Sequence, residues 1–232
     1  MKIVIIGADK GLGLVLVNKF LSNHHDVVAG HVFPAPPESL LSIESDAARL
    51  HLVQTDVTRE DVMEKAAAQV RQILGPVDVL ICVAGILVDS DRVNDLLHMD
   101  MADMRLTMEI NAIGSAIMFK HFYPVMRKDG QGIMVSVTSE GGRINNLTSK
   151  RPAYGISKIA ANKIVAIMRK TVSDVTIYAM HPGRMNTEMG YADAQIEPQE
   201  SADSIYDLLT GKKTVSPDAE WFINYKGEPM PM

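Results

Sequence analysis

Several absences from this chain of 232 residues exclude whole classes of protein. It has one cysteine, Cys82, so an internal disulfide framework is excluded, and no His/Cys cluster stands at metal-ligand spacing. No apolar run reaches the roughly 18 residues that a membrane-spanning helix needs. No basic run offers a footprint for nucleic acid or an anionic membrane. These absences predict a cytoplasmic protein with a small-molecule partner and no metal, nucleic-acid or membrane partner.

What is present is an ordinary globular composition. Hydrophobic residues make up 47% of the chain and charged residues 22%, with a formal net charge of -5. A chain of this length can bury one large core, and no internal repeat, low-complexity tract or linker divides it. We therefore expect one domain over residues 1–232.

Short apolar, β-branched runs alternate along the chain with longer stretches of helical period. Strands are expected near residues 2–6, 27–30, 50–54, 77–83, 133–138, 176–180 and 221–224. Helices are expected at 11–22, 59–74 with Thr58 as its cap, 101–127, 153–171 and 200–209. This alternation predicts an α/β fold: a single doubly wound Rossmann domain, with a mostly parallel seven-stranded sheet and helices on both faces.

A glycine-rich turn follows the first expected strand and opens the first helix. Gly7, Gly11 and Gly13 stand where a side chain would keep the backbone away from a pyrophosphate, and the helix N-terminus supplies N–H donors. A glycine pattern also makes simple tight turns. Its place between a strand and a helix favours dinucleotide binding.

Tyr154 and Lys158 stand four residues apart, so they share one face of the helix expected there. A neighbouring ammonium favours the phenolate, which would lower the Tyr154 pKa from its ordinary value of roughly 10. The pair is therefore a candidate for general acid/base catalysis.

Together these features resemble the short-chain dehydrogenase/reductase family, along the whole chain. The glycine spacing is the family's, and Asp56-Val57, Ala84-Gly85, Asn111, Ser139, the Tyr154/Lys158 pair and His181-Pro-Gly183 with Thr187 follow in the family's order. The tail at 221–229 and the stretch 189–191 resemble the carbonyl-reductase group that includes the C-factor signalling proteins. Departures are Ile6 before the first glycine, Cys82-Val83 in place of two asparagines, and Arg184 at a position that is usually apolar or aromatic.

The resemblance implies an NADP(H)-dependent oxidoreductase that interconverts a carbonyl and an alcohol by hydride transfer. It implies that Tyr154 donates the proton, Ser139 hydrogen-bonds the same oxygen, and Lys158 binds ribose and lowers the Tyr154 pKa. It assigns Asn111 to a proton relay. The implied cofactor-binding residues are Gly7, Lys10, Gly11, Leu12, Gly13, His31, Asp56, Val57, Ala84, Gly85, Tyr154, Lys158, Pro182, Gly183 and Thr187. The residues placed near the substrate by analogy are Arg143, Leu147, Thr148, Met189 and Tyr191.

NADP is preferred to NAD because of the charges near the second strand. An NAD site places an acid at that strand's end, where His31 stands, and the nearby Asp26 is at the other end. Lys10 and His31 are the candidate partners of a 2'-phosphate.

The long irregular segment 183–199 is the expected substrate lid. The helices at 101–127 and 153–171 resemble the family's subunit interface, which implies a homodimer or homotetramer. Two alternatives stay open: a dinucleotide-binding regulatory protein of the C-factor type with little turnover, and a structural subunit of a hetero-oligomer.

Overall fold

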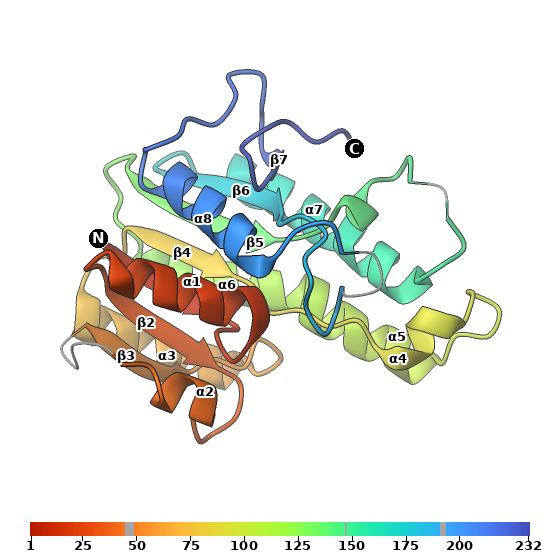
Figure 1. Ribbon diagram of the computed structural model, residues 1–232, viewed down its shortest axis with the longest axis horizontal. Coiled ribbons are helices and arrows are strands. Elements are labelled where there is room, and N and C mark those ends of the chain that lie inside the picture. The colour runs from red at the N-terminus through yellow and green to blue at the C-terminus, as the bar shows by residue number, and fades with distance from the viewer. Residues whose placement is uncertain (45–48, 147, 191–193) are drawn as a thin grey trace.

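A seven-stranded sheet organises the computed structural model, which describes residues 1–44, 49–146, 148–190 and 194–232. The strand order is β3-β2-β1-β4-β5-β6-β7, and each neighbouring pair is parallel (Figure 1). The strands are β1 Lys2–Ile6, β2 Asp26–His31, β3 Leu50–Gln54, β4 Val79–Cys82, β5 Gly132–Val137, β6 Val175–His181 and β7 Phe222–Asn224. The predicted Rossmann sheet is confirmed, with a strand at each predicted place.

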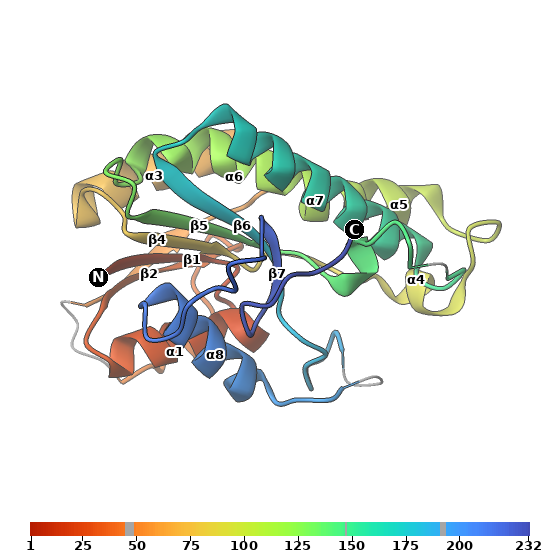
Figure 2. The same cartoon turned by 90° about the horizontal axis from the view of Figure 1, so that it is seen from above.

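Helices cover both faces of this sheet, so its strands are apolar on both sides. The main helices are α1 Gly11–Ser22, α3 Glu60–Leu74, α5 Met101–Met108, α6 Gly114–Phe122, α7 Pro152–Thr171 and α8 Pro198–Leu209. Figure 2 shows α1 and α8 on one face and α3, α6 and α7 on the other. Every residue of β4 is buried as a result.

Each face of the sheet has its own hydrophobic core. Met118 and Phe122 of α6 belong to the core beneath α3, α6 and α7. Leu16 and Phe20 of α1 pack with Tyr206 of α8 in the other core. The Phe20 and Tyr206 rings meet edge to face, with centroids 5.2 Å apart. Because the strands are parallel, their carboxyl ends lie at one edge of the sheet between these two layers.

The expected helix at 101–127 is interrupted. Between α5 and α6 the chain forms a π-helical turn, Glu109–Ile113, and after α6 it forms a 3-10 turn, Tyr123–Val125. Asn111 lies in the π-helical turn, and such turns often occur at functional sites. The 3.6-residue apolar period does not reveal the extra residue of a π turn, so the sequence predicted one continuous helix.

Three smaller differences concern helix ends and short helices. Thr58 is not a cap, because its hydroxyl donates to the Asp56 carboxylate at 2.7 Å and Arg59 occupies the N-cap position of α3. Two short helices, α2 Glu38–Leu41 and α4 Asp89–Val93, were not predicted because each is too short to show a helical period.

No helix among the described residues has the length and apolar character to cross a bilayer. No group of three His, Cys, Asp or Glu side chains among them is arranged to hold a metal ion.

Candidate active site

One cleft lies at the carboxyl ends of the strands, where the strand order reverses between β1 and β4. The loops after β1, β4, β5 and β6 and the start of α7 line it. The structure brings sixteen predicted site residues into this cleft: Gly7, Lys10, Gly11, Leu12, Asp56, Val57, Ala84, Gly85, Ser139, Thr148, Tyr154, Lys158, Pro182, Gly183, Thr187 and Met189.

The glycine turn after β1 has a geometry that only glycine permits. Gly7 has φ +81°, and a Cβ there would lie 2.7 Å from the backbone nitrogen of Ala84. A Cβ on Gly13 would lie 2.1 Å from the carbonyl oxygen of Gly7. The N-cap residue of α1, Lys10, makes no side-chain capping hydrogen bond, and Gly11 and Leu12 at the start of this helix line the cleft. This backbone cradle fits a dinucleotide pyrophosphate.

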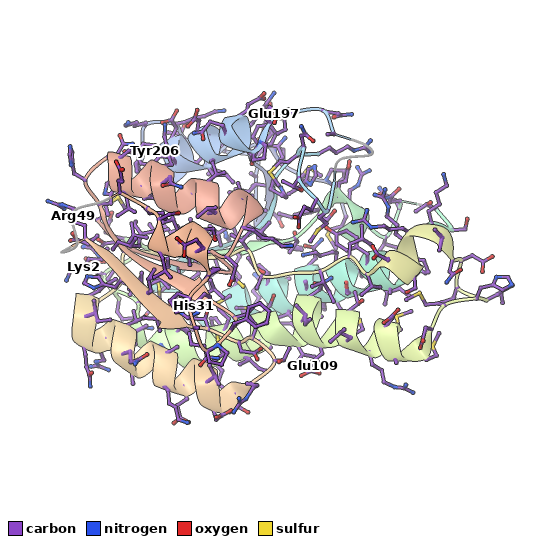
Figure 3. The ribbon with its side chains drawn as sticks, turned by 60° about the horizontal axis from the view of Figure 1, so that its bottom comes forward. Lys2, His31, Arg49, Glu109, Glu197 and Tyr206 are labelled. Atoms are coloured by element: carbon purple, nitrogen blue, oxygen red, sulfur yellow. The ribbon has the colours of Figure 1, made fainter. Side chains whose placement is uncertain are left out.

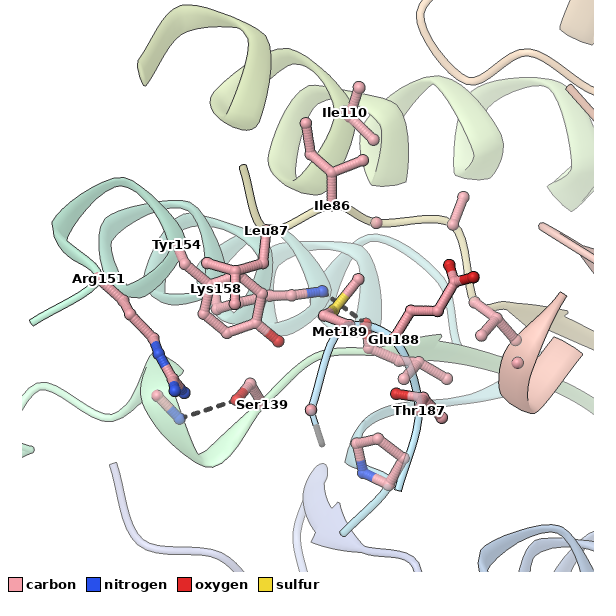
Figure 4. A pocket seen from close by; sticks show the side chains of 18 of the residues that line it. Ile86, Leu87, Ile110, Ser139, Arg151, Tyr154, Lys158, Thr187, Glu188 and Met189 are labelled. Carbon is pink, nitrogen blue, oxygen red and sulfur yellow. Dashed lines mark hydrogen bonds between the residues drawn. The ribbon is translucent and has the colours of Figure 1, made fainter. Parts of the chain in front are cut away.

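Ser139, Tyr154 and Lys158 converge on one wall of the cleft (Figure 4). Ser139 ends the chain segment after β5, and its Oγ accepts a hydrogen bond from the Gly141 N–H at 3.0 Å. Tyr154 and Lys158 are one turn apart on α7. Lys158 Nζ donates to the carbonyl oxygen of Val137 at 3.1 Å and lies 5.6 Å from the centroid of the Tyr154 ring.

Burial shifts the pKa values of Tyr154 and Lys158 on this wall of the cleft. It raises the pKa of Tyr154 above its ordinary value, although a hydrogen bond with Ser139 and the charge of Arg151 act in the opposite direction. Burial also lowers the pKa of Lys158 to about 8. The net shift is opposite to the lowering expected from Lys158, because desolvation of the phenolate outweighs the Ser139 hydrogen bond and the charge of Arg151. Tyr154 is a neutral phenol that can donate its proton.

Asn111 is buried behind this wall and does not line the cleft. Its Oδ1 accepts from the Ile86 N–H at 2.8 Å, and its Nδ2 donates to the Ile86 carbonyl at 2.9 Å and to Ser157 Oγ at 3.0 Å. A Cβ on Gly85 would lie 3.2 Å from Asn111 Oδ1 and 3.3 Å from Lys158 Nζ. Asn111 thus joins the π-helical turn to the loop after β4 and to α7, and its relay role stays a prediction.

His31 is not brought to the cleft, which corrects its predicted contact with a 2'-phosphate. His31 lies at the end of β2 (Figure 3). Its side chain is buried, and Nδ1 donates to the Phe33 carbonyl at 2.8 Å. Val32 and Phe33 line the cleft instead. Successive side chains of a strand point to opposite faces of the sheet, and the side chain of residue 31 points inward. The sequence does not show which face a residue at the end of a strand points to.

Other predicted residues are placed as follows. Gly13 packs against the glycine turn rather than lining the cleft. Arg143 also lies outside the cleft lining, with its Nε donating to the Glu140 carbonyl at 3.2 Å. Leu147 and Tyr191 lie outside the described residues.

The geometry agrees with the comparisons with known proteins. A family model described as short chain dehydrogenase matches residues 1–197. The chain belongs to the short-chain dehydrogenase family.

Relatives of this short-chain dehydrogenase match most or all of its length. The short chain dehydrogenase gsfK of Penicillium aethiopicum is 29% identical over 234 residues, covering 91% of this chain and 92% of gsfK. The carbonyl reductase Sniffer of D. melanogaster superposes with a TM-score of 0.88 at 22% identity, over 100% of this chain and 99% of Sniffer. The NADPH-bound carbonyl reductase from chicken fatty liver has a TM-score of 0.85 at 23% identity, over 100% and 98%. At these identities the two structures show the fold.

Asp91 is a site residue of this short-chain dehydrogenase that the sequence did not reveal. It lies on α4 and is fully buried, with Oδ1 accepting from the Ala153 N–H at 2.9 Å and Oδ2 accepting from the Tyr154 N–H at 2.8 Å. The carboxylate therefore caps α7, where Arg151 provides no side-chain cap, and it also interacts favourably with the helix dipole. No local pattern indicates a cap from 62 residues away.

We expect Asp91→Asn to lower the free energy of unfolding by about 2 to 4 kcal/mol. The NH2 group of the new asparagine would face a backbone N–H of α7, so two hydrogen-bond donors would meet in a buried place. Turnover should fall too, since the Tyr154 backbone loses its anchor. Denaturant unfolding and kcat on the same preparation measure both effects. Asp89→Asn, a change at an exposed carboxylate two residues away, is the control. Equal stability of the two variants would refute the capping role.

Proposed function

We propose that this protein is an NADP(H)-dependent oxidoreductase that interconverts a carbonyl and an alcohol by hydride transfer, with Tyr154 as general acid/base. The observation that carries the proposal is the convergence of Ser139, Tyr154 and Lys158 in the same cleft as the glycine cradle. The NADPH-bound carbonyl reductase among the structural neighbours supports the choice of cofactor and reaction.

In this proposal the bound dinucleotide supplies the hydride, and the chain supplies position and proton. The cradle of Gly7 and Gly11 and the N-terminus of α1 hold the pyrophosphate. Tyr154 donates its phenolic proton to the substrate oxygen as negative charge develops there, while the Ser139 hydroxyl hydrogen-bonds the same oxygen. Lys158 holds the ribose hydroxyls with its ammonium. Asn111 holds the loop after β4 and a relay water.

A panel of aldehydes, ketones and quinones with NADPH, followed by loss of nicotinamide absorbance, tests the proposal. Turnover of at least one compound is expected. Binding of NADPH with no turnover across the panel would overturn it and favour a regulatory protein of the C-factor type.

We expect Lys10→Ala to weaken NADPH binding by about 5- to 30-fold, the scale of one charge-assisted hydrogen bond, with NADH almost unchanged. Lys10 lines the cleft and pairs there with Glu188, both side chains being mostly exposed. It must exchange Glu188 for the 2'-phosphate. Glu188→Gln is the matched variant and should leave NADPH binding equal or tighter. The dissociation constants of NADPH and NADH for both variants test this prediction. An equal loss of affinity for NADH and NADPH in Lys10→Ala would show that Lys10 does not bind the 2'-phosphate.

We also propose that 183–199 is a substrate lid. Gly183 has φ +89°, and a β-bridge pairs Met185 with Ile196. Arg92 of α4 donates to the carbonyls of Met189 at 3.2 Å and Glu188 at 3.3 Å, which attaches the segment to the opposite wall of the cleft.

Amide hydrogen exchange should therefore slow in 183–199 when NADPH and substrate are both present, as closure buries these amides. The buried strand β5 serves as the internal reference, with protection that stays constant. Unchanged exchange in the segment on ligand addition would contradict the lid role.

Three further proposals concern the whole molecule. We propose one dinucleotide-binding domain over residues 1–232, in the cytoplasm. We propose a homodimer or homotetramer, with subunits meeting through the helices from α5 to α6 and α7. Exposed apolar side chains on these helices, among them Leu106, Ile113, Ile156 and Ile167, support that interface. Mass measurement in solution tests it.

A further inference from the structure

Positive charge gathers around the candidate reacting centre of a chain whose net charge is -5. At the end of the cleft built by the loop after β5, the start of α7 and the end of β6, the lining includes Lys150, Arg151, Lys158 and Arg184. Glu140 is the acid found among the described residues lining this end. Its carboxylate accepts a hydrogen bond from Arg184 Nε. Among the described residues that line this end, four cations therefore stand against one acid.

The other acids among the described lining residues do not reverse this balance. Glu188 pairs with Lys10 and Asp89 with Arg92, while Asp95 pairs with His98 at 2.6 Å. Asp56 follows β3 and Asp9 follows β1, in the half of the cleft that the glycine turn builds. An anion would therefore be attracted to the end that holds Ser139 and Tyr154.

Arg151 has the backbone conformation and the position to meet such an anion. It is the N-cap residue of α7, with φ 56° and ψ 54°, in the left-handed region that residues other than glycine rarely adopt. His24 is the other such residue in the described ranges. Strained conformations of this kind cluster at functional sites. This backbone places the Arg151 side chain in the lining of the cleft, three residues before Tyr154.

The side chain lies on the substrate side of Tyr154. Figure 4 shows it extending from the start of α7 toward the side of Ser139, while Thr187 and Glu188 lie beyond Tyr154, toward the N-terminal ribbon. Its charge acts on the phenol, lowering the pKa of Tyr154 against the larger effect of burial. The pyrophosphate cradle at Gly7 and Gly11 belongs to the opposite half, so a nucleotide phosphate is not the group that Arg151 would meet.

We propose that Arg151 binds a carboxylate of the substrate, so that the substrates are oxo-acids and the corresponding hydroxy-acids. The inference rests on the proposed function, because it assigns the group that holds the substrate while its carbonyl meets Tyr154 and Ser139. A guanidinium presents two parallel N–H donors to the two oxygens of a carboxylate, which fixes orientation as well as affinity.

Binding to the protein saturated with NADP+ tests this without turnover. In calorimetry, benzoate should bind about 10- to 100-fold tighter than the neutral isostere benzamide, the scale of a charge-assisted pair. Arg151→Gln should remove that preference and leave benzamide binding unchanged. Arg151→Gly, which suits the left-handed backbone, should do the same if glutamine perturbs the fold. Lys163→Gln, an equal loss of charge at an exposed site on the same helix, should retain the preference.

A kinetic comparison separates this inference from the proposed function. With NADPH, 4-formylbenzoate should have a higher kcat/KM than 4-formylbenzamide in the wild type, mainly through KM, and Arg151→Gln should equalise the two. Equal binding of benzoate and benzamide by the wild type, or an equal loss of both in Arg151→Gln, would overturn the carboxylate site even if both aldehydes are reduced. Preferred benzoate binding without reduction of any carbonyl would support the site and contradict the proposed function.

Discussion

Tyr154→Phe should lower turnover by a factor of about 100 to 10,000, the usual loss when a positioned general acid is removed. Tyr154 lies beside Ser139 in the cleft, and burial raises the pKa of its phenol, so the phenol keeps its proton at neutral pH. The substitution removes one oxygen from a side chain packed on α7, so the cleft keeps its shape. NADPH affinity should stay close to the wild-type value. Steady-state kinetics on a verified substrate measure the loss of turnover, and a dissociation constant for NADPH measures the cofactor affinity.

Tyr178→Phe is the matched control, because it removes a phenol oxygen from β6 outside the cleft lining. It should retain full turnover. Near wild-type activity of Tyr154→Phe would show that another group protonates the substrate.

Lys158→Met should abolish turnover and weaken NADPH binding, yet stabilise the folded chain without ligand at pH 7. Burial lowers the pKa of Lys158 to about 8 from its ordinary value near 10.5. A shift of that size corresponds to about 3 kcal/mol of differential interaction, and losing the hydrogen bond to Val137 offsets about 1 kcal/mol of it. We therefore expect a gain of about 2 kcal/mol in the free energy of unfolding at pH 7.

The lowered pKa of Lys158 also makes the free energy of unfolding depend on pH. Between pH 8 and about 10.5 the unfolded chain holds the Lys158 proton while the folded chain releases it, so stability rises with pH in that window. Below pH 8 the whole desolvation penalty is present. Lys158→Met should remove this rise, and Lys163→Met, at an exposed site, should keep it. A Lys158→Met variant that is less stable than the wild type at pH 7 would contradict the buried-ammonium account.

Patterns confined to one element were predictable from the sequence. The strands are short apolar runs covered on both faces, and Gly7 and Gly13 mark a turn where a Cβ would collide with backbone. The spacing of Tyr154 and Lys158 on one helix face likewise follows from the helix repeat. The sheet, the glycine turn and the Tyr154/Lys158 pair could therefore be predicted.

Properties that depend on contacts between distant segments could not be predicted. Asp91 caps a helix that begins 61 residues further along the chain, and its environment exists only after α4 packs against α7. The raised pKa of Tyr154 reflects burial by the assembled cleft rather than the nearby lysine. His31 was assigned by its place at a strand end, but its side chain turns inward to Phe33. In each case the tertiary environment determined the outcome.

Transfer of deuterium from NADPH labelled at the nicotinamide C4 position tests the central claim most directly. With a carbonyl substrate from the panel, the wild type should form an alcohol that carries one deuterium at the former carbonyl carbon. Tyr154→Phe should bind the same labelled cofactor and form almost none of this product. Deuterium transfer at equal rates by both proteins, or a wild type that transfers none to any carbonyl tested, would contradict the account.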